Sequence, residues 1–482
     1  MKLVSILSII YVFSLVIVQS TTIDFSNSGT GYTVSGNVVT ITSAGSYDLA
    51  GTVTDKNIVV SASCTLNLNS LSLTNSGSLT PILISSSQTV TMSLSGSSTL
   101  VDSSTNSNDG TIYLQSGASL TISGTGTLNI TPNKLMAING TDSTSLTVND
   151  GPTINIQSSS TNAGGVYLRT AVTFNNAKFT YSGSNGENHA IDSEGTVKIV
   201  KGTYTLTAGS GKGIQSENYL IIGEENGSDS DLTLTINTSN EGIEAKKIEI
   251  YSGTISITAE EDGINAASSG TDCDETVQCS GNCACYIIYK GGSLTLTSGE
   301  DGLDANGDIT ISGGQIVVFA ASSSDNQPID QDGLLSITGG TVLAAGSSAM
   351  GGITATTSQT AKTYTGTINS GAKLVASETG GTEILSMTTP KAANYLYFNH
   401  GTAFTITLDG TALTLSDAGS GTSPGGQVGP GQGNTNTTSV TTVSTTDDDD
   451  DDDDDDPIVI NTSNGYFLKG LNILFIFGLI FF

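Results

Sequence analysis

The chain has 482 residues, a formal net charge of −30 and 58 glycines, and it contains no tryptophan. Its 15 lysines and arginines stand against 45 acidic residues, which leaves no basic surface for nucleic acid or anionic lipid. No stretch of helix-forming residues repeats with the period of 3.6, so the composition excludes an α-helical fold. We therefore expect a β protein that attracts cations and binds no nucleic acid.

The first 20 residues have the layout of a secretory signal peptide. Lys2 precedes a mostly apolar run over residues 7–18, and polar residues follow it. We expect residues 1–20 to be removed and the mature protein to be extracellular, in an oxidising environment.

Residues 21–415 are expected to form one domain made of repeats. From about residue 58, short runs such as residues 119–123 and 254–258 alternate β-branched or aliphatic residues with polar ones, and turn residues bound each run. A small residue followed by an aliphatic one recurs at intervals of 21 to 29 residues, apart from one interval of 39. The recurring pairs are Ala137-Ile138, Gly165-Val166, Ala190-Ile191, Gly213-Ile214, Gly242-Ile243, Gly263-Ile264, Gly302-Leu303, Pro328-Ile329 and Gly352-Ile353.

This interval is the length of one solenoid turn, which can bury its apolar residues only by stacking on its neighbours. The predicted fold class is all-β, a single-stranded parallel β-helix with about 21–29 residues per turn. A β-sandwich or propeller is the alternative, but those folds need hairpins at short spacing or blade periods near 40 residues. Residues 21–57 and 371–415 are expected to cap the two ends.

Polar residues recur at fixed positions beside these pairs. Because strands on neighbouring turns lie about 4.8 Å apart, residues such as Asp192, Gln215 and Glu244 should form a column. Carboxylates this close repel one another unless water or a cation screens them, and Ca2+ prefers six to eight oxygen ligands. The alternative is that these residues only form turns. The predicted metal ligands are Glu241, Glu244, Glu261, Asp262, Asn265, Glu300, Asp301 and Asp304.

Cysteines cluster in a loop expected at residues 268–290, which contains Cys273, Cys279, Cys283 and Cys285. In an oxidising compartment this cluster predicts local disulfides, whose pairing the spacing leaves open. A zinc site is the alternative, although these gaps match no usual zinc spacing and no histidine is near. Cys64 is left over and is expected to be buried in a strand.

The long face of a solenoid suits a polysaccharide, with tyrosines available to stack on its sugar rings. A lyase of acidic polysaccharide needs a base beside the metal, and the sole arginine, Arg169, lies three or more turns from the densest acids. We therefore predict a carbohydrate-binding protein that is not an enzyme. A surface coat or adhesion protein is the alternative, and a calcium-dependent polysaccharide lyase is a further one. The candidate stacking residues are Tyr204, Tyr219, Tyr251, Tyr286 and Tyr289.

Residues 187–346 resemble a bacterial cell-surface carbohydrate-binding domain family with a polysaccharide-lyase-like parallel β-helix. The resemblance rests on NEGIEA at residues 240–245, EDGINA at 261–266 and EDGLDAN at 300–306, with SGTISI and SGGQI between them. It implies binding of cellulose or pectin-like polymers without cleavage. It also implies calcium bound by Glu261, Asp262, Asn265, Glu300, Asp301 and Asp304.

The C-terminal part differs in composition from the repeats. Residues 416–460 are rich in Gly, Ser and Thr and include an aspartate run at 447–456, which predicts an extended stalk. Residues 461–482, with Asn461 as the expected attachment residue, resemble a GPI-type lipid-anchor signal, because the apolar tail is too short to span a bilayer comfortably. A short transmembrane anchor is the alternative, and either anchor would place the protein at the cell surface. We expect the protein to be a monomer. Expected glycosylation sites are Asn129, Asn139, Asn226, Asn237 and Asn436.

Overall fold

The computed structural model describes residues 20–419, apart from residues 76, 104–109, 159–162, 184–187, 239, 269–272, 274–283 and 324. The described residues belong to the compact unit Met1–Gln427. Cys279, Cys283, Asn436, Asn461, the expected stalk from residue 420 on, the anchor signal and residues 1–19 of the expected signal peptide lie outside the described residues. Within the described ranges, the only helical element is the short 3-10 helix η1 (Asp229–Asp231), and no helix is long and apolar enough to cross a membrane.

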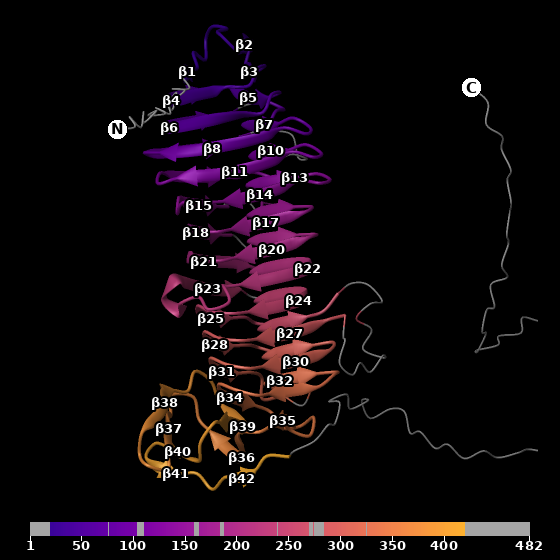
Figure 1. The fold of residues 1–482 in the computed structure, drawn as a ribbon, viewed down its shortest axis with the longest axis vertical. Helices are drawn as coiled ribbons and strands as arrows, with labels where there is room; N and C mark the ends of the chain where they lie inside the picture. The colour runs from indigo at the N-terminus through magenta and orange to yellow at the C-terminus, as the bar shows by residue number, and fades with distance from the viewer. Residues whose placement is uncertain are drawn as a thin grey trace, which may run out of the picture. The chain divides into compact units, whose positions relative to one another are not determined.

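The predicted parallel β-helix is confirmed, with strands stacked turn upon turn in about 11 turns (Figure 1). Each turn adds strands to three faces, which we number in chain order, and strands of one face pair in parallel with those of neighbouring turns. The first face contains β5 (Asn57–Val60), β7 (Ile82–Ile84), β10 (Ile112–Leu114), β13 (Ile138–Gly140), β16 (Val166–Leu168), β19 (Ile191–Ser193), β26 (Ile264–Ala266), β29 (Leu303–Ala305), β32 (Ile329–Gln331) and the first halves of β22 (Ile214–Ile222) and β24 (Ile243–Ile250).

The second face takes the second halves of β22 and β24, because these two strands continue around the corner from the first face. Its other strands are β4 (Ser46–Thr54), β6 (Cys64–Thr74), β8 (Thr89–Ser95), β11 (Ser119–Gly124), β14 (Ser145–Val148), β17 (Ala171–Phe174), β20 (Thr196–Ile199), β27 (Tyr286–Tyr289), β30 (Asp308–Ile311), β33 (Leu335–Ile337) and β35 (Thr356–Thr357).

The third face begins where β6 ends and runs to the last complete turn. Its strands are β9 (Ser97–Val101), β12 (Thr127–Thr131), β15 (Thr153–Gln157), β18 (Ala177–Ser182), β21 (Gly202–Gly209), β23 (Leu232–Thr238), β25 (Thr254–Thr258), β28 (Ser293–Thr297), β31 (Gln315–Phe319) and β34 (Thr341–Gly346).

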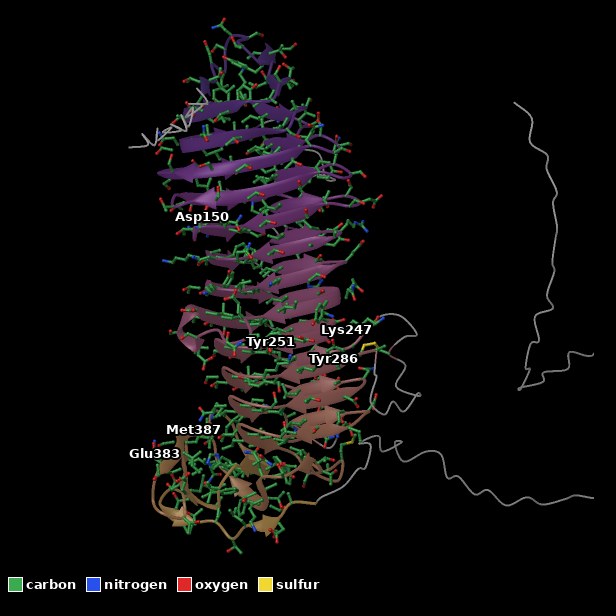
Figure 2. The ribbon with its side chains drawn as sticks, in the orientation of Figure 1. Asp150, Lys247, Tyr251, Tyr286, Glu383 and Met387 are labelled. Carbon is green, nitrogen blue, oxygen red and sulfur yellow. A yellow bond between two sulfur atoms is a disulfide. The ribbon has the colours of Figure 1, made fainter. Side chains whose placement is uncertain are left out.

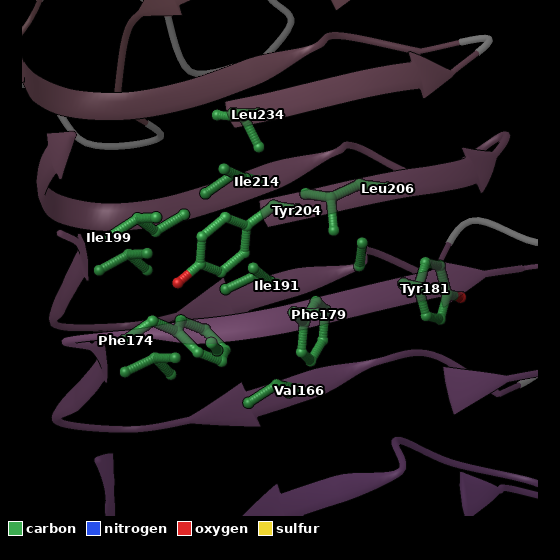
Figure 3. Packing of buried hydrophobic residues seen from close by; sticks show 14 of the residues in the cluster. Val166, Phe174, Phe179, Tyr181, Ile191, Ile199, Tyr204, Leu206, Ile214 and Leu234 are labelled. Atoms are coloured by element: carbon green, nitrogen blue, oxygen red, sulfur yellow. The ribbon is translucent and has the colours of Figure 1, made fainter. Parts of the chain in front are cut away.

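Alternation of inward and outward side chains produces the core. In β26 and β29 the aliphatic and alanine residues are buried, while the polar residue between them faces outward. Because the register of neighbouring turns is aligned, like residues stack into continuous apolar columns, each buried aliphatic contributing about 1.5–3 kcal/mol. Figure 3 shows the middle of this core, where the rings of Phe174 and Phe179 pack with centroids 5.1 Å apart.

The small residue of each repeat has a packing cause. Gly213, Gly242, Gly263 and Gly302 face the interior, and a Cβ at any of them would collide with an aliphatic side chain on the third face of the same turn. The first face therefore approaches the third closely at these four turns. The recurring small–aliphatic pair marks the narrow corner of the solenoid.

Left-handed glycines form the corner between the second and third faces. Gly253, Gly292, Gly314 and Gly340 have φ values of 117°, 94°, 73° and 83°, and each directly precedes a strand of the third face. An L residue with a side chain is strained in this conformation. The SGTISI and SGGQI motifs are thus a turn followed by a strand.

Strands outside the regular turns close both ends of the ladder. At the N-terminal end, β1 (Thr21–Thr22) pairs with β4, and β2 (Tyr32–Ser35) forms a hairpin with β3 (Val38–Ile41). At the C-terminal end, β39 (Ala393–His400) pairs antiparallel with β34. Capped edges prevent pairing with other chains.

The C-terminal cap has a second small core. Phe319 and Leu343 of the last turns pack there with Phe398 and Phe404. The cap consists of β36 (Thr360–Ile368), β39 and β42 (Ser416–Asp417), with a four-stranded sheet of β37 (Lys373–Glu378), β38 (Glu383–Thr388), β40 (Phe404–Leu408) and β41 (Thr411–Ala412).

Candidate functional site

An outward column of polar residues runs along the first face. The strand register aligns Tyr167 with Asp192, Asp192 with Gln215, and Gln215 with Glu244. Further along, Asn265 aligns with Asp304, and Asp304 with Asp330. The structure therefore brings the predicted column together, with neighbouring members one turn apart.

A second polar column precedes the small residues and contains His189, Lys212, Glu241, Asp262, Asp301 and Gln327. Consecutive turns are joined here by main-chain hydrogen bonds. The Asp262 carboxylate accepts a hydrogen bond from the backbone N–H of Asp301 at 2.8 Å, and the Asp301 carboxylate accepts one from Gln327. Part of this column thus satisfies backbone donors, as turn-forming residues do.

An open cavity of about 640 Å³ lies where the two columns meet on the turns of β16, β19 and β22. We call it the Tyr167 cavity. It is lined by Met136, Tyr167, Asn188, His189, Asp192, Glu194, Gln215 and Glu217. One aromatic ring, one thioether and several hydrogen-bonding groups therefore face a single concave surface.

A charged network fixes the Tyr167 side chain. Its hydroxyl donates to the Glu194 carboxylate at 2.7 Å, and the same carboxylate is paired with Arg169. The Arg169 guanidinium lies 5.3 Å from the centre of the Tyr167 ring. Because Arg169 neutralises Glu194 and covers part of the ring, Tyr167 is held in one orientation beside the cavity.

Burial changes the protonation of two cavity residues. Burial, with help from Lys212, lowers the pKa of His189 to about 4. Its Nδ1 accepts a hydrogen bond from the backbone N–H of Lys212 at 2.9 Å, so at neutral pH Nε2 carries the proton and is a donor. Burial, with the nearby Glu217 and Glu194, raises the pKa of Asp192 to about 7.

Lys212 forms ion pairs with both of the first two predicted metal ligands and offsets one of their two charges. Its ammonium lies 2.8 Å from Glu241 and also pairs with Glu244, and all three side chains are only 14–20% exposed. Asn265 donates to the other oxygen of Glu241 at 3.0 Å. These two carboxylates are therefore already paired within the protein itself.

The remaining predicted ligands lie among like charges. Burial raises the pKa of Asp262 to about 6 and that of Asp301 to about 7, and neighbouring carboxylates add to this effect. The pKa values of Glu261 and Asp304 are raised for the same reasons. Glu300 is exposed and contributes to the potential that acts on Asp262 and Asp301.

The fit of this cluster to a cation is mixed. The Oδ1 atom of Asn265 is buried without a hydrogen-bond partner, one turn from Asp304, and so offers an unused oxygen. Among the residues that the structure describes, however, no three His, Cys, Asp or Glu side chains are already arranged to hold a metal ion. The oxygens are of the type that calcium prefers, but they do not yet converge.

Two of the five candidate stacking tyrosines were predicted wrongly. Tyr204 and Tyr289 are 0% and 1% exposed and belong to the core, because an inward position in a strand is a packing position (Figure 3 shows Tyr204). Tyr219, Tyr251 and Tyr286 face outward and are half-buried.

The cysteine cluster contains one described disulfide, between Cys273 and Cys285. Cys64 is free and buried at the start of β6, as expected. Of the expected glycosylation sites, Asn226 and Asn237 are exposed, whereas Asn129 and Asn139 are half-buried on strands. The Asn129 carboxamide accepts a hydrogen bond from Asn155 at 2.9 Å, which places it inside an asparagine ladder.

The metal ligands predicted from the sequence lie at residues 241–304, and the Tyr167 cavity was not predicted. The pattern that could have found it was present, because Tyr167, Asp192 and Gln215 occupy equivalent positions of successive repeats. The cavity is also lined by Glu194, Glu217 and Met136. These residues do not occupy equivalent positions of the repeats, so the pattern could not reveal them.

Comparison with known families gives one relationship. The sequence model of a family described as carbohydrate-binding domain-containing protein matches residues 35–271 and 228–332, which together span more than half of the chain. A search of curated proteins and one of solved structures gave no match. The family match supports carbohydrate as the ligand and a role in binding rather than catalysis. The chain therefore belongs to the family of carbohydrate-binding domain-containing proteins.

Proposed function

We propose that the protein is a non-catalytic polysaccharide-binding protein of the cell surface, that the Tyr167 cavity contacts the sugar chain, and that calcium supports binding. The observation that carries this proposal is the Tyr167 cavity itself, which lies on the outward polar column within the family match. Sugar sites in proteins combine an aromatic or apolar surface with a few directed polar groups.

The composition of the cavity suits a pyranose ring. Tyr167 and Met136 offer apolar surface to the C–H face of a sugar, while Asp192, Gln215 and Glu217 can hydrogen-bond its hydroxyl groups. The neutral His189 adds a donor at Nε2. Because Arg169 compensates Glu194, the cavity retains two uncompensated acids, which favours a neutral sugar over a uronate in direct contact.

We assign the proposed calcium to those predicted ligands that do not pair with Lys212. Glu241 and Glu244 are paired with Lys212, so the ion is placed with Glu261, Asp262, Asn265, Glu300, Asp301 and Asp304. The free Oδ1 of Asn265 and the raised pKa values of Asp262 and Asp301 support this assignment, since a cation would offset the burial and the repulsion that raise these pKa values. Calcium would then stiffen the turns beyond the cavity.

The proposed location rests on the two ends of the sequence. An apolar run at residues 7–18 and an apolar tail at 471–482 fit a secreted protein that receives a lipid anchor. The acidic stretch at 447–456 would then hold the β-helix away from the membrane surface.

A pull-down with insoluble polysaccharides tests the proposed function. The protein is mixed with cellulose, cross-linked polygalacturonate or chitin, each with calcium or with excess chelator. Retention on at least one polymer, reduced by chelator, is expected, with no new reducing ends and no unsaturated product in the supernatant.

Each other outcome has a distinct meaning. Retention that chelator does not change would remove calcium from the proposal and leave polysaccharide binding. Release of reducing ends would favour a hydrolase or lyase. No retention on any polymer would contradict polysaccharide binding and favour the coat or adhesion alternative.

A further inference from the structure

A cluster of tyrosines and lysines lies on the second face, around the corner from the Tyr167 cavity. Strand register places Lys247 of β24 between Tyr219 of β22 and Tyr286 of β27 in one outward column. Figure 2 labels Lys247, Tyr251 and Tyr286 on these neighbouring turns. We call this cluster the tyrosine platform, which consists of Tyr219, Lys247, Glu249, Tyr251, Tyr286 and Lys290.

One carboxylate holds the three tyrosines together. Glu249 is 9% exposed and accepts hydrogen bonds from the hydroxyls of Tyr219, Tyr251 and Tyr286, the last at 3.3 Å. Burial alone would raise the pKa of Glu249, but these hydrogen bonds and Lys290 lower it overall, so the carboxylate is ionised. The rings are therefore fixed before any ligand arrives, which reduces the entropy lost on binding.

The ring faces differ in their accessibility. The Lys290 ammonium lies 4.4 Å from the centre of the Tyr251 ring and covers it. The Cα atoms of Tyr219 and Tyr286 lie two turns apart, roughly 10 Å, and both half-buried side chains reach the same carboxylate, Glu249. Lys247 stands between them in the same outward column.

The platform and the cavity share a strand. Gln215 and Glu217 line the Tyr167 cavity, and Tyr219 begins the second face two residues further along β22. The strand bends between Ser216 and Tyr219, so these four residues span at most about 13 Å, which an oligosaccharide of a few sugars can cover. A polymer that leaves the cavity toward Glu217 therefore meets the platform next.

We infer that the tyrosine platform is a second sugar-contacting subsite, on which the polysaccharide chain bound in the Tyr167 cavity continues. Tyr219 and Tyr286 stack on its pyranose rings, and Lys247 donates hydrogen bonds to their substituents. Glu249 contacts no sugar and acts as a positioning residue for the three rings. The inference rests on the proposed polysaccharide-binding function.

Oligosaccharide length tests the inference. Titration calorimetry compares the disaccharide and the hexasaccharide of cellulose, and those of polygalacturonate in parallel, against the wild-type chain and the variants Tyr219→Ala, Tyr286→Ala and Lys247→Met. Each variant is expected to weaken hexasaccharide binding about five- to tenfold and to leave disaccharide binding unchanged. Tyr286→Phe retains the ring and should keep most of the hexasaccharide affinity.

The controls separate the two hypotheses. Lys178→Met alters an exposed lysine of β18 on the third face, away from both surfaces, and should change neither affinity. If Tyr167→Ala weakens both lengths while the platform variants bind both like wild type, the platform is overturned and the cavity stands. If the wild-type protein binds no oligosaccharide, the proposed polysaccharide-binding function is itself contradicted. Lys247→Met removes no core contact, so it decides the question even if an alanine variant unfolds.

Discussion

At the scale of single residues, the first face combines compensated and uncompensated charges. Glu194 and Arg169 form one compensated pair, and Lys212 pairs with both Glu241 and Glu244. Burial, followed by the nearby Glu217 and Glu194, raises the pKa of Asp192 to about 7. This distribution separates the side chains that maintain the fold from those that can meet a ligand.

Tyr167→Ala should weaken polysaccharide binding about tenfold, because the ring provides the largest apolar surface of the cavity. Tyr167→Phe should lose less, since it keeps the ring and gives up only the hydrogen bond to Glu194. Binding isotherms on the polymer that retains the wild type would measure both. Equal binding by wild type and the alanine variant would exclude Tyr167 from the contact.

Lys212→Met should reduce the free energy of unfolding by about 2–4 kcal/mol, because two largely buried carboxylates lose their common partner. Chemical denaturation in chelator would measure the loss. Adding Glu244→Gln to the variant should restore part of the stability by removing one of the two charges. A double variant no more stable than Lys212→Met would show that charge repulsion is not the cause.

At the scale of elements, glycines at the corners determine the shape of each turn. The glycines that face the core set the narrow corner between the first and third faces, and left-handed glycines turn the chain from the second face to the third. Between these corners the strands need only alternate apolar and polar residues. Sequence periodicity was therefore a sufficient guide to the strands themselves.

Gly263→Ala should destabilise the protein by about 1–3 kcal/mol, since the added Cβ would collide with Leu296 in the core. Gly380→Ala is the matched control, because a Cβ there would meet nothing within 4 Å. Thermal unfolding of both variants makes the comparison. Similar melting temperatures for the two would argue that Leu296 relaxes without cost.

Removal of the disulfide by Cys273→Ser with Cys285→Ser should cost about 2–4 kcal/mol for a loop of 12 residues. Cys285 directly precedes Tyr286, so the change should also loosen one ring of the tyrosine platform. Hydrogen exchange of β27, compared with that of β17 four turns earlier, would locate the effect. Uniform loss of protection in both strands would mean that the disulfide acts on the whole solenoid.

At the scale of the whole molecule, stacking of the repeats brings acidic residues of neighbouring turns together. Every turn that carries an acid places it beside the acids of its neighbours, and this repulsion adds to burial in raising the pKa values of Asp262, Asp301 and Asp304. A net charge of −30 adds repulsion over longer distances. Stability should consequently depend on protons and cations.

In chelator, the protein should be more stable at pH 5 than at pH 7.5. Asp192, Asp262 and Asp301 have folded-state pKa values of about 7, 6 and 7 against 3.8 for an ordinary aspartate. Between about pH 4 and 7 the unfolded chain has lost these protons while the folded chain keeps them, so stability falls as the pH rises. His189, with a pKa of about 4, acts in the opposite direction but is a single group.

Calcium should remove most of this dependence if the proposed ion binds, because it favours the ionised carboxylates. Melting curves at the two pH values, with calcium and with chelator, measure the effect. A melting temperature in chelator that rises from pH 5 to 7.5 would contradict the carboxylate explanation. Calcium-independent curves at pH 7.5 would contradict the ion.

The sequence by itself determined the repeating strands, the solenoid and the polar columns, because each depends on the spacing of neighbouring residues and on stacking of identical turns. Tertiary structure alone decided which tyrosines are buried, since Tyr204 and Tyr219 look alike in sequence and differ in the direction of one strand position. It also brought Lys212 to Glu241 and Glu244, and Met136 and Glu217 to the Tyr167 cavity. Those contacts join residues on different turns, where the lengths of the intervening loops set which side chains meet.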